Sequence, residues 1–201
     1  MMITVPHWLR MFYPSVEWQV KTDTNTVFIT FDDGPHPVIT PKVLDILDEF
    51  NAKATFFCVG DNVQKYPETY QHIINRGHRT ANHSFNHING WKTYHKTYLE
   101  NIKKAAALID SNLFRPPYGK ITPVQLRKLK KSHRIIMWSV LTYDFSKAIT
   151  PEQCLKNSLT GLKPGSIIVF HDSEKAADNM LYVLPEFLKQ SSKAGLKAIT
   201  L

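Results

Sequence analysis

Two adjacent carboxylates, Asp32 and Asp33, stand out among the side chains of this 201-residue sequence that could do chemistry. They follow the apolar run 27–29, which predicts a buried strand, and Gly34 and Pro35 end that strand in a turn. Two neighbouring anions repel each other unless a cation or a proton is shared between them. The pair therefore predicts a cation site or a surface turn, because Asp-Asp-Gly is also common turn chemistry.

Two histidines offer further ligands for a cation. His83 and His87 are four positions apart, and on one helical turn both rings would point to the same side, as a shared metal requires. Nine histidines in one chain produce such spacings by chance, so the carboxylate pair is what favours a metal. Two histidines and one Asp leave coordination positions open, as in catalytic rather than structural zinc sites.

Two more segments carry candidate catalytic groups. In Arg115–Gly119, two prolines stiffen a turn that could hold the amide of Tyr118 as a hydrogen-bond donor. His171 and Asp172 end an apolar run, which places the histidine at the mouth of a pocket. Taken alone, the first segment would be an ordinary loop and the histidine could be a core residue.

The elements that must position these residues alternate between strand and helix. Strands are predicted at 27–29, 54–59, 79–82, 113–114, 135–140, 166–170 and 196–201. Helices are predicted after Thr40-Pro41, at 67–77 and 94–109, after Thr122-Pro123, after a capping box at Thr150–Gln153, and at 178–190. This alternation predicts an α/β fold with a parallel sheet and helices outside, doubly wound or closed into a barrel.

Active sites of such folds gather at the C-terminal ends of the strands. The candidate residues fit this rule, since each group directly follows a predicted strand. His83 and His87 follow the third strand, Arg115 the fourth, Asp144 the fifth and His171 the sixth. This agreement favours a chemical role for the two aspartates over a surface turn.

Composition limits the other possibilities. A chain of this length with 43% hydrophobic residues can bury one good core, so we expect one domain at 27–201. Residues 1–26 form an aromatic-rich lead-in expected to pack over one end of that core; its aromatic residues include Trp8, Phe12, Tyr13 and Trp18. Cys58 lies in an apolar run and is predicted to be a buried free thiol.

The net charge of +8 is spread along the chain and comes with no nucleic-acid-binding motif. We therefore expect no nucleic-acid partner; the basic run 127–134 is typical of a solvated helix face, and a basic surface also suits an anionic glycan. No segment is apolar for long enough to span a membrane, and no signal peptide is visible, so a cytoplasmic location is expected. The sequence leaves the oligomeric state open.

Four ordered motifs resemble those of the polysaccharide deacetylase family, the NodB-homology enzymes of carbohydrate esterase family 4. They are Thr30-Phe31-Asp32-Asp33-Gly34-Pro35, His83-Ser84-x-x-His87, Arg115-Pro116-Pro117-Tyr118-Gly119, and the late strand ending in His171-Asp172. The resemblance covers residues 27–201. It implies an irregular (β/α)7 barrel and removal of N-acetyl groups from N-acetylglucosamine-type glycans, chitin-like or peptidoglycan-like, with release of acetate.

The resemblance also implies a metal site with its base. Asp33, His83 and His87 would hold a divalent metal, commonly zinc, with cobalt or nickel as further possibilities. Asp32 would be the general base, and Arg115 would pair with it and hold it ionised.

The remaining implied roles concern the oxyanion and the leaving amine. Tyr118 would give its backbone amide to the oxyanion. His171 would be the general acid, and Asp144 would set its pKa and orientation. Trp91 and His36 lie beside these motifs and could line a sugar groove together with Tyr118.

The sequence departs from the family at a fourth motif, usually Asp-x-x-Asp-Trp. Leu141 replaces the first Asp and Phe145 the Trp, while Asp144 is kept. Two milder departures are Val169, where the family usually has leucine, and Ile88, where it often has proline. The altered motif keeps a non-catalytic glycan-binding descendant open as an alternative, and the motifs do not separate N-deacetylation from O-deacetylation or hydrolysis of a non-sugar amide.

Overall fold

The computed structural model describes residues 3–4 and 13–201, and these contain a nine-stranded sheet in which the strands pair in parallel. The strands are β1 (Val16–Glu17), β2 (Thr26–Asp32), β3 (Ala54–Cys58), β4 (Arg79–Asn82), β5 (Leu113–Phe114), β6 (Arg134–Ile136), β7 (Val140–Leu141), β8 (Ile167–His171) and β9 (Lys197–Ala198). They lie in the order β1-β6-β5-β4-β3-β2-β8-β7, and β9 pairs with β2. The predicted α/β class with a parallel sheet is confirmed.

The chain connections require this sheet to be curled. β6 is second and β7 last among the eight strands of the main order, and six inter-strand steps would separate them by about 29 Å in a flat sheet. Only residues 137–139 connect them, and four residue steps span about 14 Å at most. Backbone contacts also link the β1 side to the β8 side, through an antiparallel bridge between Gln19 and Ser166 and a hydrogen bond from Val20 N–H to Gly165 O at 2.9 Å. The sheet therefore bends round into an irregular barrel.

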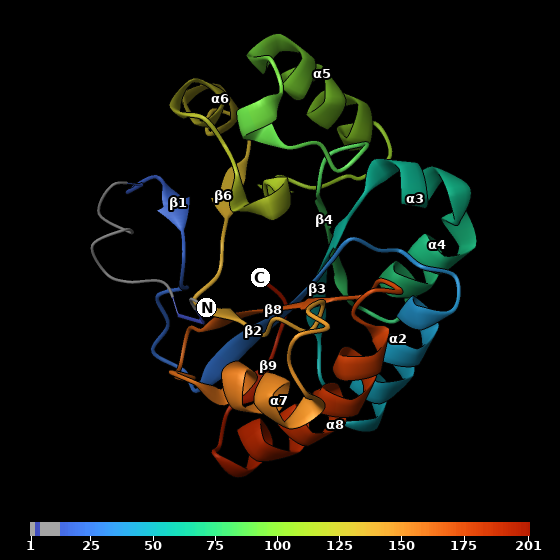
Figure 1. Ribbon diagram of the computed structural model, residues 1–201, viewed down its shortest axis with the longest axis vertical. Helices are drawn as coiled ribbons and strands as arrows, with labels where there is room; N and C mark the ends of the chain where they lie inside the picture. Colours follow the sequence, from blue (N-terminus) through green and yellow to red (C-terminus); the bar gives the residue numbers. More distant parts are fainter. Residues whose placement is uncertain (1–2, 5–12) are drawn as a thin grey trace.

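Helices surround the strands (Figure 1). They are α2 (Ile39–Glu49), α3 (Gly60–Lys65), α4 (Pro67–Asn75), α5 (His95–Ala106), α6 (Pro123–Leu129), α7 (Pro151–Leu159) and α8 (Ala177–Lys193), with 3₁₀ turns η1 (Gly90–Lys92) and η2 (Pro117–Gly119). Each α-helix buries some of its side chains and exposes others, which is why the helices form an outer layer. In the described part of the chain, no helix combines the length and the apolar character needed to cross a membrane.

Aromatic rings build the core at the centre of the sheet. Phe31 of β2 stacks on Phe56 of β3 and Phe170 of β8, with ring centroids 4.9 and 5.9 Å apart. Phe170 also meets Phe187 of α8 edge to face at 5.7 Å, which joins the sheet to the helical layer. Cys58 lies in the same cluster as a buried free thiol, as predicted. This packing fixes the ends of β2 and β8, which carry candidate catalytic residues.

Residues 135–140 do not form the single strand predicted from their apolar run. β6 ends at Ile136 and β7 begins at Val140. Between them, the carbonyls of Ile136 and Met137 accept hydrogen bonds from the Arg115 side chain at 3.3 and 2.9 Å. The buried Arg115 side chain, which comes from the end of β5, therefore binds carbonyl groups that a continuous strand would use for pairing. The local hydrophobic pattern of residues 135–140 does not indicate this long-range contact.

Two predicted helix starts also differ. Thr40 does not cap α2, which begins one residue earlier; its hydroxyl instead donates to the carboxyl group of Asp172 at 2.5 Å. Thr150 does cap α7, since its hydroxyl accepts the N–H of Gln153 at 3.3 Å. The Gln153 side chain donates to Asn157 rather than reaching back, so the predicted capping box is only half present.

Part of the N-terminal stretch belongs to the sheet, because β1 pairs with β6. Trp18 is buried in a cluster with Phe114 of β5 and Ile135 of β6, and Tyr13 packs against that cluster. Trp8 and Phe12 of the predicted lead-in lie outside the described residues.

Candidate active site

The candidate residues lie at the C-terminal ends of neighbouring strands. Asp32 ends β2 and is paired in register with His171, the last residue of β8. His83 directly follows β4, Arg115 directly follows β5, and Asp144 comes shortly after β7. Since β5, β4, β3, β2, β8 and β7 are consecutive in the sheet, one edge gathers these groups.

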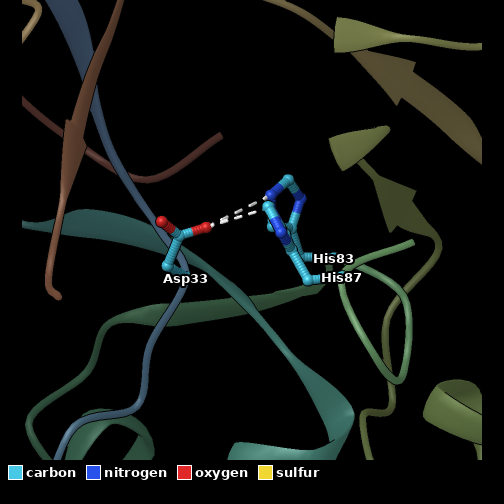
Figure 2. Close-up of side chains that lie close together, drawn as sticks. All are labelled: Asp33, His83 and His87. Carbon is cyan, nitrogen blue, oxygen red and sulfur yellow. Dashed lines mark ion pairs between the residues drawn. The ribbon is translucent and has the colours of Figure 1, made fainter. Parts of the chain in front are cut away.

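Three of them form a cluster suited to a metal ion. The ligand atoms of Asp33, His83 and His87 all lie within 4.8 Å of one another. Figure 2 shows both imidazole rings turned toward the Asp33 carboxylate; its Oδ1 is 3.2 Å from His87 Nε2 and 3.7 Å from His83 Nε2. The two rings converge without a helical turn, because residues 83–87 are not helical and both Ser84 and His87 have positive φ, 64° and 52°.

The protonation of this cluster fits a cation. His83 is buried, and its Nδ1 lies 2.8 Å from the carbonyl oxygen of Arg115, so Nδ1–H donates and the Nε2 lone pair stays available. Burial lowers the pKa of His83 to about 4, which keeps the ring neutral at pH 7. Burial alone would raise the pKa of Asp33, but the hydrogen bond with His87 and the charges of His171 and His83 hold it well below its usual range. Two imidazole nitrogens and a carboxylate oxygen are the donor set of a catalytic zinc site.

The other aspartate of the pair has a separate cation. Arg115 is fully buried, and its Nη1 donates to Asp32 Oδ1 at 2.6 Å and to Thr30 Oγ1 at 2.7 Å. The Phe57 ring stacks 4.1 Å from the guanidinium carbon. Together with the carbonyls of the β6–β7 break, these contacts satisfy the guanidinium although Leu141 supplies no carboxylate. The predicted Arg115–Asp32 contact is present.

Tyr118 lies beside the Asp33, His83 and His87 cluster. It takes the left-handed conformation, with φ 60°, inside the stiff turn that follows Arg115. No partner for its backbone N–H is found within the described residues, so this amide stays available as a donor. Its ring is 60% exposed and lies 4.5 Å from the His87 ring between centroids. The structure therefore places Tyr118 next to the candidate metal ligand His87.

His171 is held by Asp144 through two hydrogen bonds. His171 Nδ1 lies 2.8 Å from Asp144 Oδ1, and the backbone N–H of His171 donates to Oδ2 at 2.7 Å. Burial alone would lower the pKa of His171, but the charge of Asp144 and its hydrogen bond raise it to about 9. The ring of Phe145 meets the imidazole edge to face, with centroids 4.9 Å apart. His171 is thus a protonated imidazole at neutral pH with Nε2 as its second N–H.

The sequence prediction gave no role to Asp172, which the structure places beneath the site. Its Oδ1 accepts the N–H of Gly34 at 3.1 Å, and its own N–H donates to the carbonyl of Asp32 at 3.2 Å. A Cβ atom on Gly34 would lie 2.1 Å from Oδ2, so only glycine fits there. Burial raises the pKa of Asp172 to about 8. The sequence did offer one indication of this role. Asp172 directly follows His171 at the end of a strand, where successive side chains point to opposite faces of the sheet.

The two other residues expected to line a groove have partners outside the catalytic groups. His36 Nε2 contacts Glu174 on the loop after β8 at 3.4 Å. Trp91 is 63% exposed, and its indole N–H donates to the carbonyl of Ile121 at 3.2 Å. Neither belongs to the metal-ligand cluster found among the described residues.

Comparison with known proteins gives a family match and close structural neighbours. The family model described as "Polysaccharide deacetylase" matches residues 19–135, more than half of the chain. A peptidoglycan N-acetylglucosamine deacetylase of Bacillus cereus is 34% identical over 183 residues, 87% of this chain and 66% of the relative, so the chain spans just under two thirds of that protein. A chitooligosaccharide deacetylase of Azorhizobium caulinodans is 33% identical over 77% of each sequence.

The fold is shared with solved structures of the same kind. The crystal structure of a peptidoglycan N-acetylglucosamine deacetylase superposes with a TM-score of 0.90 and 30% identity, covering 98% of this chain and 95% of that one. This match agrees with the irregular (β/α)7 barrel of NodB-homology type predicted from the motifs.

Proposed function

The chain belongs to the polysaccharide deacetylase family, and from this we propose that it is a metal-dependent enzyme that removes N-acetyl groups from N-acetylglucosamine-type glycans and releases acetate. The observation that carries the proposal is the joint geometry at one edge of the sheet. The Asp33, His83 and His87 cluster lies beside a separate Asp32–Arg115 pair. The relatives named for activity on peptidoglycan and chitooligosaccharides support the choice of glycan.

The three-ligand cluster would hold the metal, and its donor set favours zinc. A divalent cation there supplies Lewis acidity, which activates water at neutral pH and polarises a carbonyl oxygen. His83 is oriented for this task by its hydrogen bond to the carbonyl of Arg115.

Asp32 is the group we assign to accept the proton of the attacking water. Its ion pair with Arg115 engages Oδ1, so Oδ2 is the oxygen left for proton transfer. Asp33, one residue on, is directed to the histidines. With a cation bound at Asp33 and Arg115 at Asp32, each of the adjacent carboxylates would have its own positive partner, which would offset the repulsion between them.

Amide hydrolysis also needs donors for the oxyanion and for the leaving nitrogen. The free N–H of Tyr118 is the oxyanion donor, and the loss of one such donor typically costs about 3 kcal/mol of transition-state stabilisation. His171 gives its Nε2 proton to the amine, because Asp144 holds Nδ1 and keeps the ring protonated. The amine can then leave as a neutral group.

The direct test is to measure acetate after incubating zinc-loaded protein with chito-oligosaccharides and peptidoglycan fragments. We expect acetate, and we expect the chelator-treated protein to regain activity when zinc is added back. An O-acetylated sugar in the same assay separates ester from amide hydrolysis. Stoichiometric metal without acetate from any of these substrates would overturn the proposal, and absence of both metal and acetate would favour a non-catalytic glycan-binding protein.

A further inference from the structure

The positive charge of this chain is concentrated in one segment. Residues 92–134 contain 11 Lys and Arg residues and two Asp and Glu residues, whereas the rest of the chain contains 14 and 15. The net charge of +8 therefore comes from this segment and is not spread along the chain. The segment runs from the end of η1 through α5 and α6 to the start of β6.

Most of these charges belong to two neighbouring helices. α5 and α6 pack against each other and lie together at the top of Figure 1. The side chain of Gln125 in α6 joins their starts, because it donates to the carbonyls of Gly90 and Thr93, just before α5, at 2.9 and 3.2 Å. We define the basic face as six exposed side chains of these helices and the turn after α6: Lys96, Lys103, Lys104, Arg127, Lys128 and Lys131.

The basic face has no acidic partner in the described part of the chain, since none of its six side chains forms an ion pair there. Other exposed cations do form such pairs, for example Lys65 with Asp61 at 2.6 Å. Glu100 is the one carboxylate on α5, and α6 carries none. Unpaired charges of one sign attract counter-ions to a surface, so the basic face is suited to an anionic partner from outside the chain.

Exposed apolar side chains lie beside these charges. Tyr94, directly before α5, is 68% exposed, Val124 of α6 is 42% exposed, and Leu108, shortly after α5, is 39% exposed. Val124 precedes Arg127 and Lys128 by three and four positions in α6, so the three side chains share one side of that helix. Apolar side chains beside lysines are typical of helices that lie in the headgroup region of a membrane.

The type of cation also indicates the kind of partner. Five of the six residues of the basic face are lysines, whose hydrated ammonium groups sit on flexible stems. Arginine, in contrast, makes the bidentate contacts that specify an individual phosphate or carboxylate. Lysines therefore suit a diffuse negative surface, such as anionic lipid headgroups. A soluble polyanion would use the charges but would leave the neighbouring apolar side chains in water.

We propose that the basic face docks the protein on a bilayer that contains anionic phospholipids. The lysines lie at the headgroups in this arrangement, while Tyr94, Val124 and Leu108 enter the boundary with the acyl chains. α5 follows the loop that carries His83 and His87, so the docked surface adjoins the edge of the sheet that carries the candidate site. The inference is independent of the proposed function, because it uses none of the candidate catalytic residues.

Co-sedimentation with vesicles measures this binding directly. The probes are vesicles of phosphatidylcholine alone and mixed vesicles that also contain about 30% phosphatidylglycerol, an anionic phospholipid. We expect binding to the mixed vesicles to be at least about tenfold tighter, and this preference should be lost as NaCl rises from about 0.1 M to about 1 M. Equal binding to the two kinds of vesicle at low salt would overturn the proposal.

A triple variant tests the basic face itself. Arg127→Gln, Lys128→Gln and Lys131→Gln together should weaken binding to mixed vesicles about 100-fold, because each basic residue at an anionic surface contributes about fivefold. Thermal unfolding followed by circular dichroism checks that the variant is folded.

A matched control removes the same charge elsewhere. Lys163, Lys193 and Lys197 are exposed and lie outside the basic face, and their combined replacement by glutamine should change the affinity by less than about threefold. Equal losses in the two triple variants would assign the binding to net charge alone and would overturn the proposed face.

A further variant separates a bilayer from a soluble polyanion. Tyr94→Ser combined with Val124→Ser should weaken binding to mixed vesicles about 3- to 30-fold and leave binding of inorganic polyphosphate unchanged, because only a bilayer buries apolar side chains. Tyr182→Ser, which removes an exposed ring from α8, should change neither affinity. If the double variant binds both probes as the wild type does, the partner is a soluble polyanion and the proposal fails.

Discussion

Replacing Asp144 with asparagine should move the alkaline limb of the pH–rate profile to lower pH. The Asp144 carboxylate accepts two hydrogen bonds from His171, at 2.8 Å from Nδ1 and at 2.7 Å from the backbone nitrogen. Burial by itself lowers the pKa of His171, and this carboxylate then raises it from 6.5 to about 9, helped by Asp33 and Asp32. A rise of that size corresponds to about 3 kcal/mol in favour of the imidazolium.

The direction of the change follows from the role of His171 as an acid. A histidine with a raised pKa is protonated below that pKa, so wild-type kcat/KM should fall only as the pH rises through about 9. In Asp144→Asn the imidazole stays buried but loses the adjacent charge, so its pKa should fall to 6.5 or below. At pH 8 the protonated fraction would then be about 30-fold smaller. A cation bound to Asp33 would weaken the effect of the Asp33 carboxylate on the His171 pKa equally in the wild type and in Asp144→Asn. The difference in His171 pKa between the two proteins therefore reports the effect of Asp144.

The assay is kcat/KM for acetate release from about pH 5 to 10, with the His171 pKa followed separately by imidazole NMR in the zinc-loaded protein. The NMR arm gives an answer even if the variant is inactive. Glu174→Gln, which removes an exposed carboxylate from the loop after β8, should leave the limb in place. If the limb and the NMR pKa of Asp144→Asn both match the wild type, Asp144 does not set His171 and the assignment of the acid is wrong.

Three other substitutions test the rest of the site. Asp32→Asn should retain stoichiometric zinc by mass spectrometry and lose about 10²- to 10⁴-fold in kcat, because it removes the general base; an active variant would contradict that role. His87→Ala should bind zinc more weakly in a chelator competition, whereas His95→Ala on α5 should match the wild type, and equal zinc affinity in both variants would rule out His87 as a ligand. Arg115→Met should lower the free energy of unfolding, measured in urea, by about 3–5 kcal/mol, because Asp32 would stay buried without its cation. The control Arg127→Met replaces an exposed arginine and should change that free energy by less than about 0.5 kcal/mol. Equal losses in the two variants would refute this reasoning.

The edge on which the site lies could be predicted because it depends on local signals. β2 and β8 are apolar runs that stop at a polar residue, Asp32 in one and His171 in the other. In a parallel sheet the C-terminal ends of the strands lie at one edge, so these polar residues come together there. The contacts between individual side chains at that edge, such as Arg115 with Asp32 and Asp144 with His171, were predicted instead from the resemblance of the motifs to a known family.

The details that sequence reasoning missed depend on partners far away in the chain. His83 and His87 converge through positive φ values at Ser84 and His87, which no residue spacing indicates. Leu141 offers Arg115 no carboxylate, and main-chain carbonyls at the β6–β7 break accept hydrogen bonds from the guanidinium instead. Backbone carbonyls are present at every position, so their use by a buried side chain cannot be read from residue types.

Arg115 has one further consequence. Its side chain holds Asp32, while its backbone carbonyl accepts the N–H of the candidate metal ligand His83. A single residue thus contacts both the candidate metal ligand His83 and the proposed base Asp32, so a displacement of the end of β5 would move both. Substitutions of the guanidinium remove only one of these two links, because the carbonyl remains with any amino acid. The candidate metal cluster with His83 and the proposed base Asp32 are therefore linked through one residue. A substitution of Arg115 would nevertheless disturb Asp32 while leaving the hydrogen bond to His83 in place.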